Sequence, residues 1–337
     1  MRAALIVALS IVVVSATACA TQPSRPGPDA SALRFAIPNE PLAVPVIVTY
    51  ESDLFTEHGV TVDATPVECC TRALDALIEG EYDVSLATDV ALAARGIDSD
   101  GFRILATVAV AEDDSRVVAR RSAGIETAAD LAGKRIGVVR SGQAHCYLHT
   151  LLESESLLEN AVELVFLENS EGHDALHSGD IDAYATRPPM IGRLVGDLRS
   201  DAVILEAPVS PTKTLSLVVR DDVLEHRPDD VALLLSALIE SEELTSDRQH
   251  VGSVGAPWLD TLPDVLSADV ATANFRVQLD QALIVALEEQ MRWIIGSPCF
   301  EDVPSVTAMP DVLTLVDPSP LWSLDPSRVR IIGWEPR

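Results

Sequence analysis

Two pairs of histidines stand at a spacing that could bind a metal ion. His145 and His149 are four residues apart, and so are His173 and His177. Side chains at this spacing share one face of a helix, which is a common arrangement of zinc ligands. Neither pair has a third ligand at a typical spacing. We expect His173 and His177 on the outer face of their helix, and we take His145, near the start of its helix, as a candidate ligand contact.

Cysteine is the second reactive side chain, and four cysteines follow Cys19: Cys69, Cys70, Cys146 and Cys299. Thiolates together with an imidazole would suit zinc or copper. Alternatively the thiols line a pocket for an organic ligand, or they form disulfides, which an exported protein permits. No spacing here specifies a tetrahedral site or a pairing. We favour the organic pocket, with Cys69 and Cys70 as candidate ligand contacts, and expect no metal and no cofactor.

A strand-to-helix turn at Ser141, Gly142 and Gln143 is a third candidate. Residues 135–139 form a compact apolar strand, and an i, i+3, i+4 apolar stripe follows the turn. The first N–H groups of a helix and its dipole favour an anion or a polar oxygen. The turn is therefore either one wall of a ligand site, opposite the helix that starts at Cys69, or an ordinary connection in an α/β domain.

The elements that position these residues alternate between strands and helices, which predicts parallel βαβ units. The pattern A-L-x-x-G-x-x-D occurs twice, at residues 76–83 and 175–182, each time as a helix, a glycine and a strand. This repetition suggests two lobes built alike. Residues 116–120 and 215–220 resemble each other and are expected to be the two crossings. We predict lobe one at residues 33–118 and 219–337, and lobe two at residues 119–218.

Residues 1–19 have the pattern of a secretory signal peptide. Arg2 supplies the positive charge, residues 3–14 are apolar but short for a bilayer span, and small residues precede Cys19. This resembles a lipobox, in which the cysteine carries a diacylglycerol thioether, although Ala16 stands where leucine is usual. The alternative is cleavage at the A-x-A site and release. Residues 20–32 are rich in proline and are expected to be a flexible tether.

The composition is strongly acidic, with 52 acidic against 24 basic residues and a net charge of −28. Such a surface repels nucleic acid and anionic membranes, so we expect no nucleic-acid partner. The only lysines are Lys134 and Lys213. A body of roughly 305 residues is more than one core usually serves, which again predicts two lobes.

The order of these motifs resembles a known family. The chain is similar to the substrate-binding subunits of ABC importers in the nitrate, sulfonate, taurine and thiamine-pyrimidine-precursor group. The most specific piece is D-L-x-G-K-x-I-G-V at residues 130–138. The matching pieces are residues 43–62, 73–87, 124–148, 175–189 and 215–238.

The resemblance implies a type II periplasmic-binding-protein fold, an α/β fold with two lobes, a ligand cleft and two hinge crossings. It puts Arg187 at the cleft wall, where many members carry Trp-Glu-Pro and this chain has Thr-Arg-Pro-Pro at residues 186–189. A guanidinium there could bind a carboxylate, sulfonate or phosphate, or Arg187 could be a surface residue. We add Thr49 and Thr88 as candidate ligand contacts.

The function implied is that of a monomeric, lipid-anchored protein on the extracytoplasmic face of the cell membrane. It would capture a small anionic or heteroaromatic ligand and deliver it to an ABC permease and its ATPase. One alternative is an enzyme like the thiamine-pyrimidine synthases, whose cysteine-rich motif is longer than Cys69-Cys70. Another is a binding lobe that senses a ligand for a partner receptor.

Overall fold

The computed structural model describes residues 32–97, 101–112, 114–140, 142–188, 190–208, 212–296 and 309–336. The predicted signal peptide, nearly all of the predicted tether, Ser141 and Cys299 lie outside these described residues. Two β-sheets organise the described chain, one of seven strands and one of five.

The larger sheet has the strand order β12-β11-β4-β10-β3-β1-β2. Its strands are β1 (Leu33–Pro38), β2 (Val62–Val67), β3 (Val84–Thr88), β4 (Phe102–Glu112), β10 (Thr212–Arg220), β11 (Asn274–Asp280) and β12 (Val329–Arg330). Strand β1 lies between β2 and β3 and runs parallel to both, whereas β10 is antiparallel to β3 and β4. The parallel part thus comes from the first segment of the chain, and later strands extend it.

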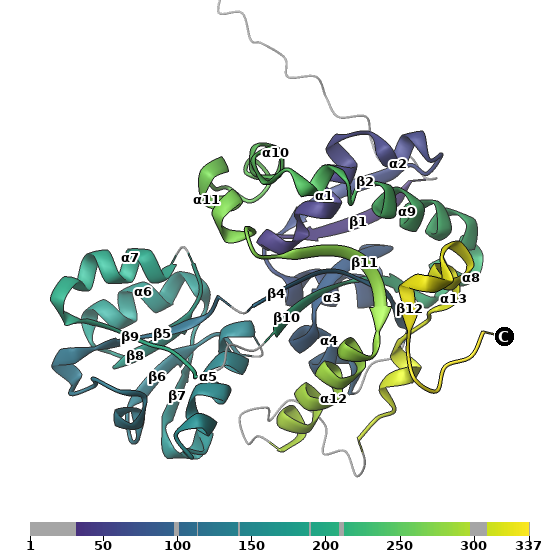
Figure 1. Ribbon diagram of the computed structural model, residues 1–337. Helices are drawn as coiled ribbons and strands as arrows, with labels where there is room; N and C mark the ends of the chain where they lie inside the picture. The colour runs from purple at the N-terminus through teal and green to yellow at the C-terminus, as the bar shows by residue number, and fades with distance from the viewer. Residues whose placement is uncertain are drawn as a thin grey trace, which may run out of the picture. The chain divides into compact units, whose positions relative to one another are not determined.

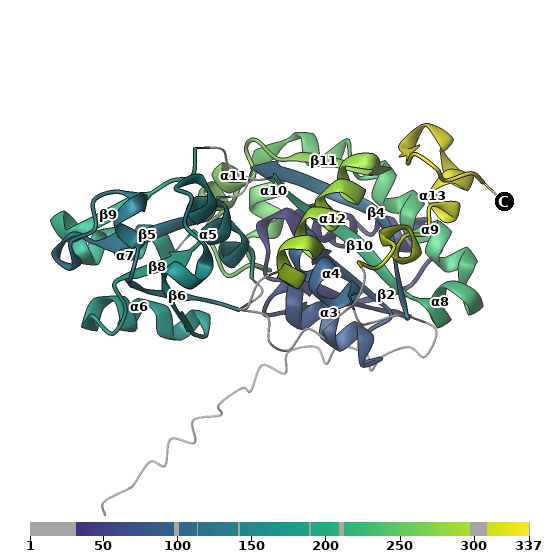
Figure 2. The same cartoon turned by 90° about the horizontal axis from the view of Figure 1, so that it is seen from below.

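Helices lie on both faces of this sheet (Figure 1). They are α1 (Val44–Glu51), α2 (Leu54–Glu57), α3 (Cys70–Ile78), α4 (Asp89–Gly96), α8 (Asp221–His226), α9 (Pro228–Glu240), α10 (Arg248–Gly255), α11 (Pro263–Asp269), α12 (Gln281–Gly296) and α13 (Ser319–Leu324). Figure 2 shows α12 running beside α4, against which it packs. Among the described residues, no helix has both the length and the apolar composition needed to cross a bilayer.

The smaller sheet has the order β7-β6-β8-β5-β9. Its strands are β5 (Arg116–Arg120), β6 (Arg135–Val138), β7 (Glu163–Phe166), β8 (Ala183–Thr186) and β9 (Ala202–Leu205), and its helices are α5 (Gln143–Ser154), α6 (Asn169–Ser178) and α7 (Met190–Leu198). Side chains of β5 alternate between two apolar clusters. Val117 and Ala119 pack with Leu148 of α5, and Val118 packs with Leu176 of α6. This period of two means that helices cover both faces of this sheet as well.

The repeated sequence pattern corresponds to a repeated structure. The parallel order β2-β1-β3 in the larger sheet matches β7-β6-β8 in the smaller one. In the first copy, Asp83 accepts hydrogen bonds from the backbone N–H of Arg34 (2.9 Å) and from its Nη2 (2.6 Å). In the second copy, Asp182 accepts the same two bonds from Arg135, at 3.0 and 2.8 Å. The repeated aspartate therefore ties the first strand of each unit to its third.

The predicted α/β class with two crossings is confirmed. The chain passes from the larger sheet to the smaller one between β4 and β5, and returns between β9 and β10. The boundaries predicted at 118/119 and 218/219 fall inside β5 and β10, each of which belongs wholly to one sheet. The sheets change at residues 113–115 and 206–211 instead, because the two similar segments are full strands that flank the crossings.

Candidate functional site

The carboxyl ends of the parallel strands carry most of the predicted site residues. In the larger sheet, Cys69 follows β2 and Thr88 ends β3, and Glu40, which was not predicted, follows β1. In the smaller sheet, Gly142 follows β6 and Arg187 follows β8. Ligands of open α/β sheets bind at this edge, where loops lead from strands into helices. The candidates from both halves of the chain thus occupy the binding edges of their sheets.

Four charged side chains form a closed set of ion pairs, which we call the four-charge ring: Glu40, Arg187, Asp114 and Lys213. Arg187 Nη1 lies 2.8 Å from Glu40 Oε2, and its Nε lies 3.4 Å from Asp114 Oδ1. Lys213 Nζ lies 3.2 Å from Glu40 Oε1 and 3.4 Å from the same Asp114 oxygen. Each cation therefore contacts both carboxylates.

The ring joins the two sheets at their crossings. Glu40 follows β1 and Arg187 follows β8, so their contact connects the carboxyl edges of the two sheets. Asp114 lies in the first crossing, and Lys213 is the second residue of β10, directly after the return crossing. Any movement of one sheet relative to the other would act on the ion pairs that Arg187 makes.

Glu40 stays ionised although it is buried. Burial would raise the pKa of its carboxyl group, but the charges of Arg187 and Lys213 outweigh this effect. A hydrogen bond from the backbone N–H of Leu42 to Oε1 (3.3 Å) adds to the lowering. The pKa of Glu40 is about 2 as a result. The carboxylate is a fixed negative charge in the ring at neutral pH.

The described cysteines are reduced, and they belong to different elements. Cys69 precedes α3 and is partly exposed, and Cys70 is buried in the first turn. Burial, and next the charge of Glu40, raise the pKa of the Cys70 thiol far above its usual range, so it remains protonated. Cys146 is buried in α5, and its thiol lies 3.2 Å from Gln290 Oε1 of α12. A protonated thiol is neither a nucleophile nor a metal ligand.

Neither the metal hypothesis nor a disulfide gains support. Among the described residues, no group of three or more His, Cys, Asp or Glu side chains is arranged to hold a metal ion. His173 lies between Asp174 (2.8 Å) and Asp197 (2.7 Å), and its ring stacks with that of His177. These contacts place the His173 pair within lobe two, at α6 and α7.

His145 lies at a second contact between the two halves of the chain. It is fully buried in α5, and its ring meets the ring of Trp293 from α12 edge to face at 5.2 Å. His149 stacks on the same indole at 5.0 Å. Glu159 Oε1 accepts the indole N–H of Trp293 at 3.2 Å and lies 3.6 Å from His145 Nε2. His145 therefore packs at an interface between α5 and α12.

Burial lowers the pKa of His145 to about 4, although the charge of Glu159 acts in the opposite direction. The charges of Arg140 and His149 add to the lowering. His145 is consequently a neutral ring at neutral pH, able to donate or accept one hydrogen bond.

Three other predicted site residues, Thr49, Gln143 and Thr88, are buried. Thr49 is completely buried in α1, and its hydroxyl lies 2.7 Å from both Pro45 O and Ser241 Oγ of the helix-α9 end. The hydroxyl of Thr49 is therefore used within the core, and its role as a ligand contact stays a prediction. Gln143 is buried at the start of α5, and Thr88 is buried at the end of β3.

Sequence reasoning missed several residues of these two contacts. Glu40 and Asp114 lie in polar loops, and one signal for Glu40 was its place just after an apolar strand. Lys213 stood out only as one of two lysines. Trp293 and Glu159 carried no pattern that joined them, because their partners lie far away in sequence.

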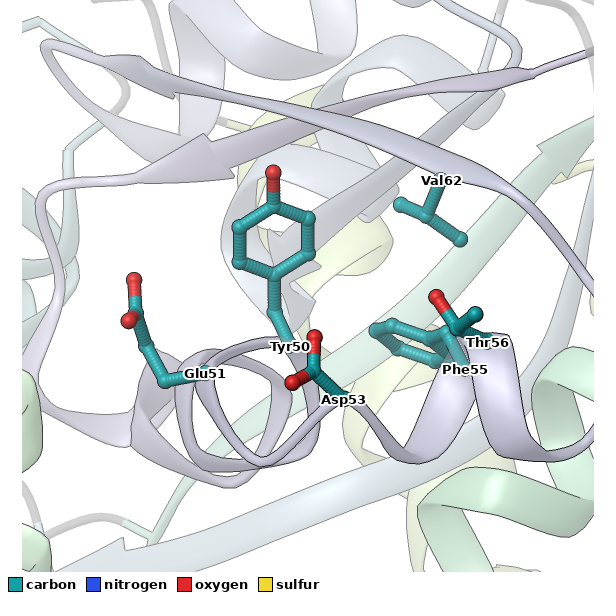
Figure 3. A pocket seen from close by; sticks show the side chains of 6 residues that line it. All are labelled: Tyr50, Glu51, Asp53, Phe55, Thr56 and Val62. Atoms are coloured by element: carbon teal, nitrogen blue, oxygen red, sulfur yellow. The ribbon is translucent and has the colours of Figure 1, made fainter.

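A pocket of about 340 Å³ lies elsewhere, at the start of β2. Figure 3 shows its lining residues, which come from α1, α2, the turn between them and β2: Tyr50, Glu51, Asp53, Phe55, Thr56 and Val62. Glu51 accepts the indole N–H of Trp258 at 2.7 Å. The pocket is at the amino end of β2, so it is separate from the binding edge described above.

Comparisons with known proteins agree with this architecture. A binding protein of Brucella abortus (strain 2308) is 24% identical over 216 residues, which cover 63% of this chain and 66% of the relative. The match thus spans slightly less than two thirds of that relative's length. The alkanesulfonate-binding protein of Xanthomonas axonopodis pv. citri, solved with bound MOPS, has a TM-score of 0.68 at 18% identity and covers 85% of this chain and 98% of its own.

The periplasmic nitrate-binding protein of Synechocystis PCC 6803 has a TM-score of 0.61 at 12% identity, covering 81% of this chain and 84% of its own. These likenesses show the fold, which is the two-lobe type II periplasmic-binding-protein fold. A family model described as NMT1/THI5 like matches residues 40–248, more than half of the chain. The chain belongs to the NMT1/THI5-like family.

Proposed function

We propose that this chain is the extracytoplasmic solute-binding protein of an ABC importer. It binds a small organic ligand, anionic or heteroaromatic, between its two lobes and delivers it to a permease that is coupled to an ATPase. It acts as a monomer and catalyses no reaction.

The contact between Glu40 and Arg187 carries this proposal. It joins the carboxyl edge of β1 to the carboxyl edge of β8, so the two edges that bind ligands in α/β sheets are next to each other. Family membership and the fold add support. Relatives with this fold are named for binding sulfonate and nitrate, which makes small polar solutes the first class to test.

The ligand site combines residues of both lobes. Lobe one contributes Thr88, Cys69 and Cys70, and lobe two contributes the α5 start with Ser141, Gly142, Gln143 and His145, and Arg187 after β8. The lobes are residues 33–118 with 219–337, and residues 119–218, adjusted by the few residues that complete β5 and β10. The two crossings act as the hinge.

The mature protein is held at the membrane by a diacylglycerol on Cys19, with residues 20–32 as the tether. This proposal rests on the sequence pattern of residues 1–19. The folded body then faces the exterior side, where it meets both the solute and the permease.

A thermal-shift screen tests the binding function. The purified protein is melted with taurine, ethanesulfonate, nitrate, 4-aminopyrimidine and small carboxylates, and each hit is measured by calorimetry. A ligand at 100 times its Kd should stabilise the fold by about 2.7 kcal/mol, which is a rise in Tm of roughly 4 °C.

The variant Arg187→Gln should weaken binding of the best hit at least tenfold. Arg121→Gln is the matched control, because Arg121 also pairs with a carboxylate, Glu126 at 2.9 Å, but on an exposed surface. Failure of every compound to shift the melting temperature, or equal effects of the two variants, would argue against the proposed site.

A further inference from the structure

The four-charge ring determines which ligands Arg187 can accept. In this ring the guanidinium is contacted by Glu40 at Nη1 and by Asp114 at Nε. The second cation, Lys213, is contacted by the same two carboxylates. Two positive and two negative charges therefore balance within the ring. An oxyanion that approached Arg187 would meet a guanidinium already neutralised by carboxylates.

The backbone conformation around Glu40 fixes the position of its carboxylate in the ring. It is the N-cap of the short 3-10 helix Pro41–Ala43, where its Oε1 accepts the N–H of Leu42 at 3.3 Å. Glu40 is 1% exposed, and its other carboxylate oxygen, Oε2, accepts a hydrogen bond from Nη1 of Arg187. A capping carboxylate in a buried site has little room to swing away. Glu40 is thus a carboxylate partner of this guanidinium in the arrangement that the structure shows.

We propose that Glu40 occupies the position that a ligand oxyanion would take on Arg187, and that the site therefore disfavours oxyanions relative to uncharged ligands. This inference rests on the proposed binding function and narrows its ligand class. Sulfonates, nitrate and carboxylates would be repelled by a like charge a few ångströms away. An uncharged nitrogen heterocycle such as 4-aminopyrimidine carries no negative charge, so Glu40 does not repel it in this way.

The surroundings of the ring point in the same direction. Asp269 is the last residue of α11. Partial burial, and next the charge of Asp114 in the ring, raise the pKa of its carboxyl group. The Cys70 thiol beside Glu40 is uncharged. The neighbours that act on the ring thus add negative charge or none.

A gain of binding provides the test. Glu40→Gln keeps the size and the capping oxygen but removes the charge, which leaves Arg187 able to accept an anion. Titration calorimetry with ethanesulfonate should give at least tenfold tighter binding to Glu40→Gln than to the unmodified protein. Glu206→Gln is the matched control, because Glu206 pairs with Arg116 at 3.0 Å on an exposed surface, and it should show no gain.

Asp114→Asn serves as a second variant if Glu40→Gln does not fold, because Asp114 is about one-third exposed. It should show a smaller gain of the same sign. The inference is overturned if neither variant gains affinity for ethanesulfonate, or if the unmodified protein already binds ethanesulfonate more tightly than 4-aminopyrimidine. The second result would leave the proposed binding function intact. A protein that binds no compound of the whole panel would refute the binding function, but it would not exclude a gain of ethanesulfonate affinity in the two variants.

Discussion

Glu40 is a buried carboxylate whose charge depends on two partners. Its pKa of about 2 lies below the ordinary value of 4.5, because Arg187 and Lys213 outweigh the effect of burial. As pH falls below 4.5, the unfolded chain takes up a proton at this position before the folded chain does. The stability that the ionised Glu40 contributes is therefore present above pH 4.5 and lost as pH falls towards 2.

We expect Glu40→Gln to lower the free energy of unfolding at pH 7 by about 3 kcal/mol, since it leaves Arg187 and Lys213 with one carboxylate partner. Urea unfolding of both proteins at pH 7 and at pH 3 measures this. The difference between them should shrink at pH 3. A difference that does not change with pH would mean that Glu40 is not ionised in the fold.

His145 makes the protein sensitive to acid in a different pH window. Its pKa is about 4 in the fold because of burial, against an ordinary value of 6.5. Between pH 6.5 and 4 the unfolded chain binds the proton more readily, so stability falls as pH is lowered, by up to about 1.4 kcal/mol per pH unit. Hydrogen bonds that His173 donates to Asp174 and Asp197 raise the pKa of His173, so that histidine acts in the opposite direction.

The two histidines give opposite expectations for unfolding measured from pH 7 to pH 4.5. His145→Gln should flatten the loss of stability on acidification, and His173→Gln should steepen it. Equal slopes for both variants and the unmodified protein would show that neither histidine carries the dependence.

At the scale of elements, the two βαβ units are held by the same arginine–aspartate device. Burial would raise the pKa of Asp83, yet hydrogen bonds from Arg34 lower it, and Asp182 with Arg135 shows the same pattern. The side chain of Asp83 is 10% exposed and that of Asp182 is 17% exposed. Asp83 also lies 3.6 Å from Arg220 of β10.

We expect Asp83→Asn and Asp182→Asn each to lower the free energy of unfolding by about 1–3 kcal/mol, with the larger effect at Asp83. Chemical denaturation measures both, and Asp63→Asn in the neighbouring strand β2 is a suitable control that should stay within about 0.5 kcal/mol. A larger loss at Asp182 than at Asp83 would contradict the expected order, which follows from burial and the additional arginine.

The elements could be predicted from the sequence where their signals are local. The sequence predicted a helix that starts at Cys69, and the structure has α3 at Cys70–Ile78. The duplicated aspartate predicted a repeated unit, which the strand orders confirm. Its arginine partners were not predicted, because Arg34 and Asp83 are 49 residues apart and only the folded sheet brings them together.

The candidate site was harder to predict for the same reason. Its edge follows from strand-to-helix turns, which are local, so Cys69 and Gly142 could be named from the sequence, whereas Arg187 was named from the family resemblance. The partner of Arg187 is Glu40, 147 residues earlier, and no local pattern connects them.

For the whole molecule, the two contacts between the lobes have different characters. The four-charge ring is ionic and lies at the crossings, whereas the contact between α5 and α12 is aromatic and includes a hydrogen bond from Trp293 to Glu159. Opening of the lobes about the crossings would break the contact between α5 and α12 before it strained the chain segments that connect the lobes. The hinge proposed for ligand entry thus has ionic contacts at the crossings and an aromatic contact between α5 and α12.

The net charge of the chain bears on how it stays at a membrane. At −28, the protein is repelled by anionic lipid surfaces, so peripheral attachment by charge is unfavourable. Attachment to a membrane would therefore come from the lipid proposed on Cys19. A single acyl chain binds only weakly, but the diacylglycerol of a lipoprotein supplies two chains, which is enough for stable anchoring.

We accordingly expect the unmodified protein in the membrane fraction of cells, and we expect it to stay there when the membranes are washed with high salt, since salt screens charge without weakening a lipid anchor. Cys19→Ala should move it to the soluble fraction at every salt concentration. Fractionation with mass spectrometry of the mature amino terminus measures both. A protein that is soluble without the substitution, and whose Cys19 carries no lipid mass, would show that the signal peptide is cleaved for release rather than for anchoring.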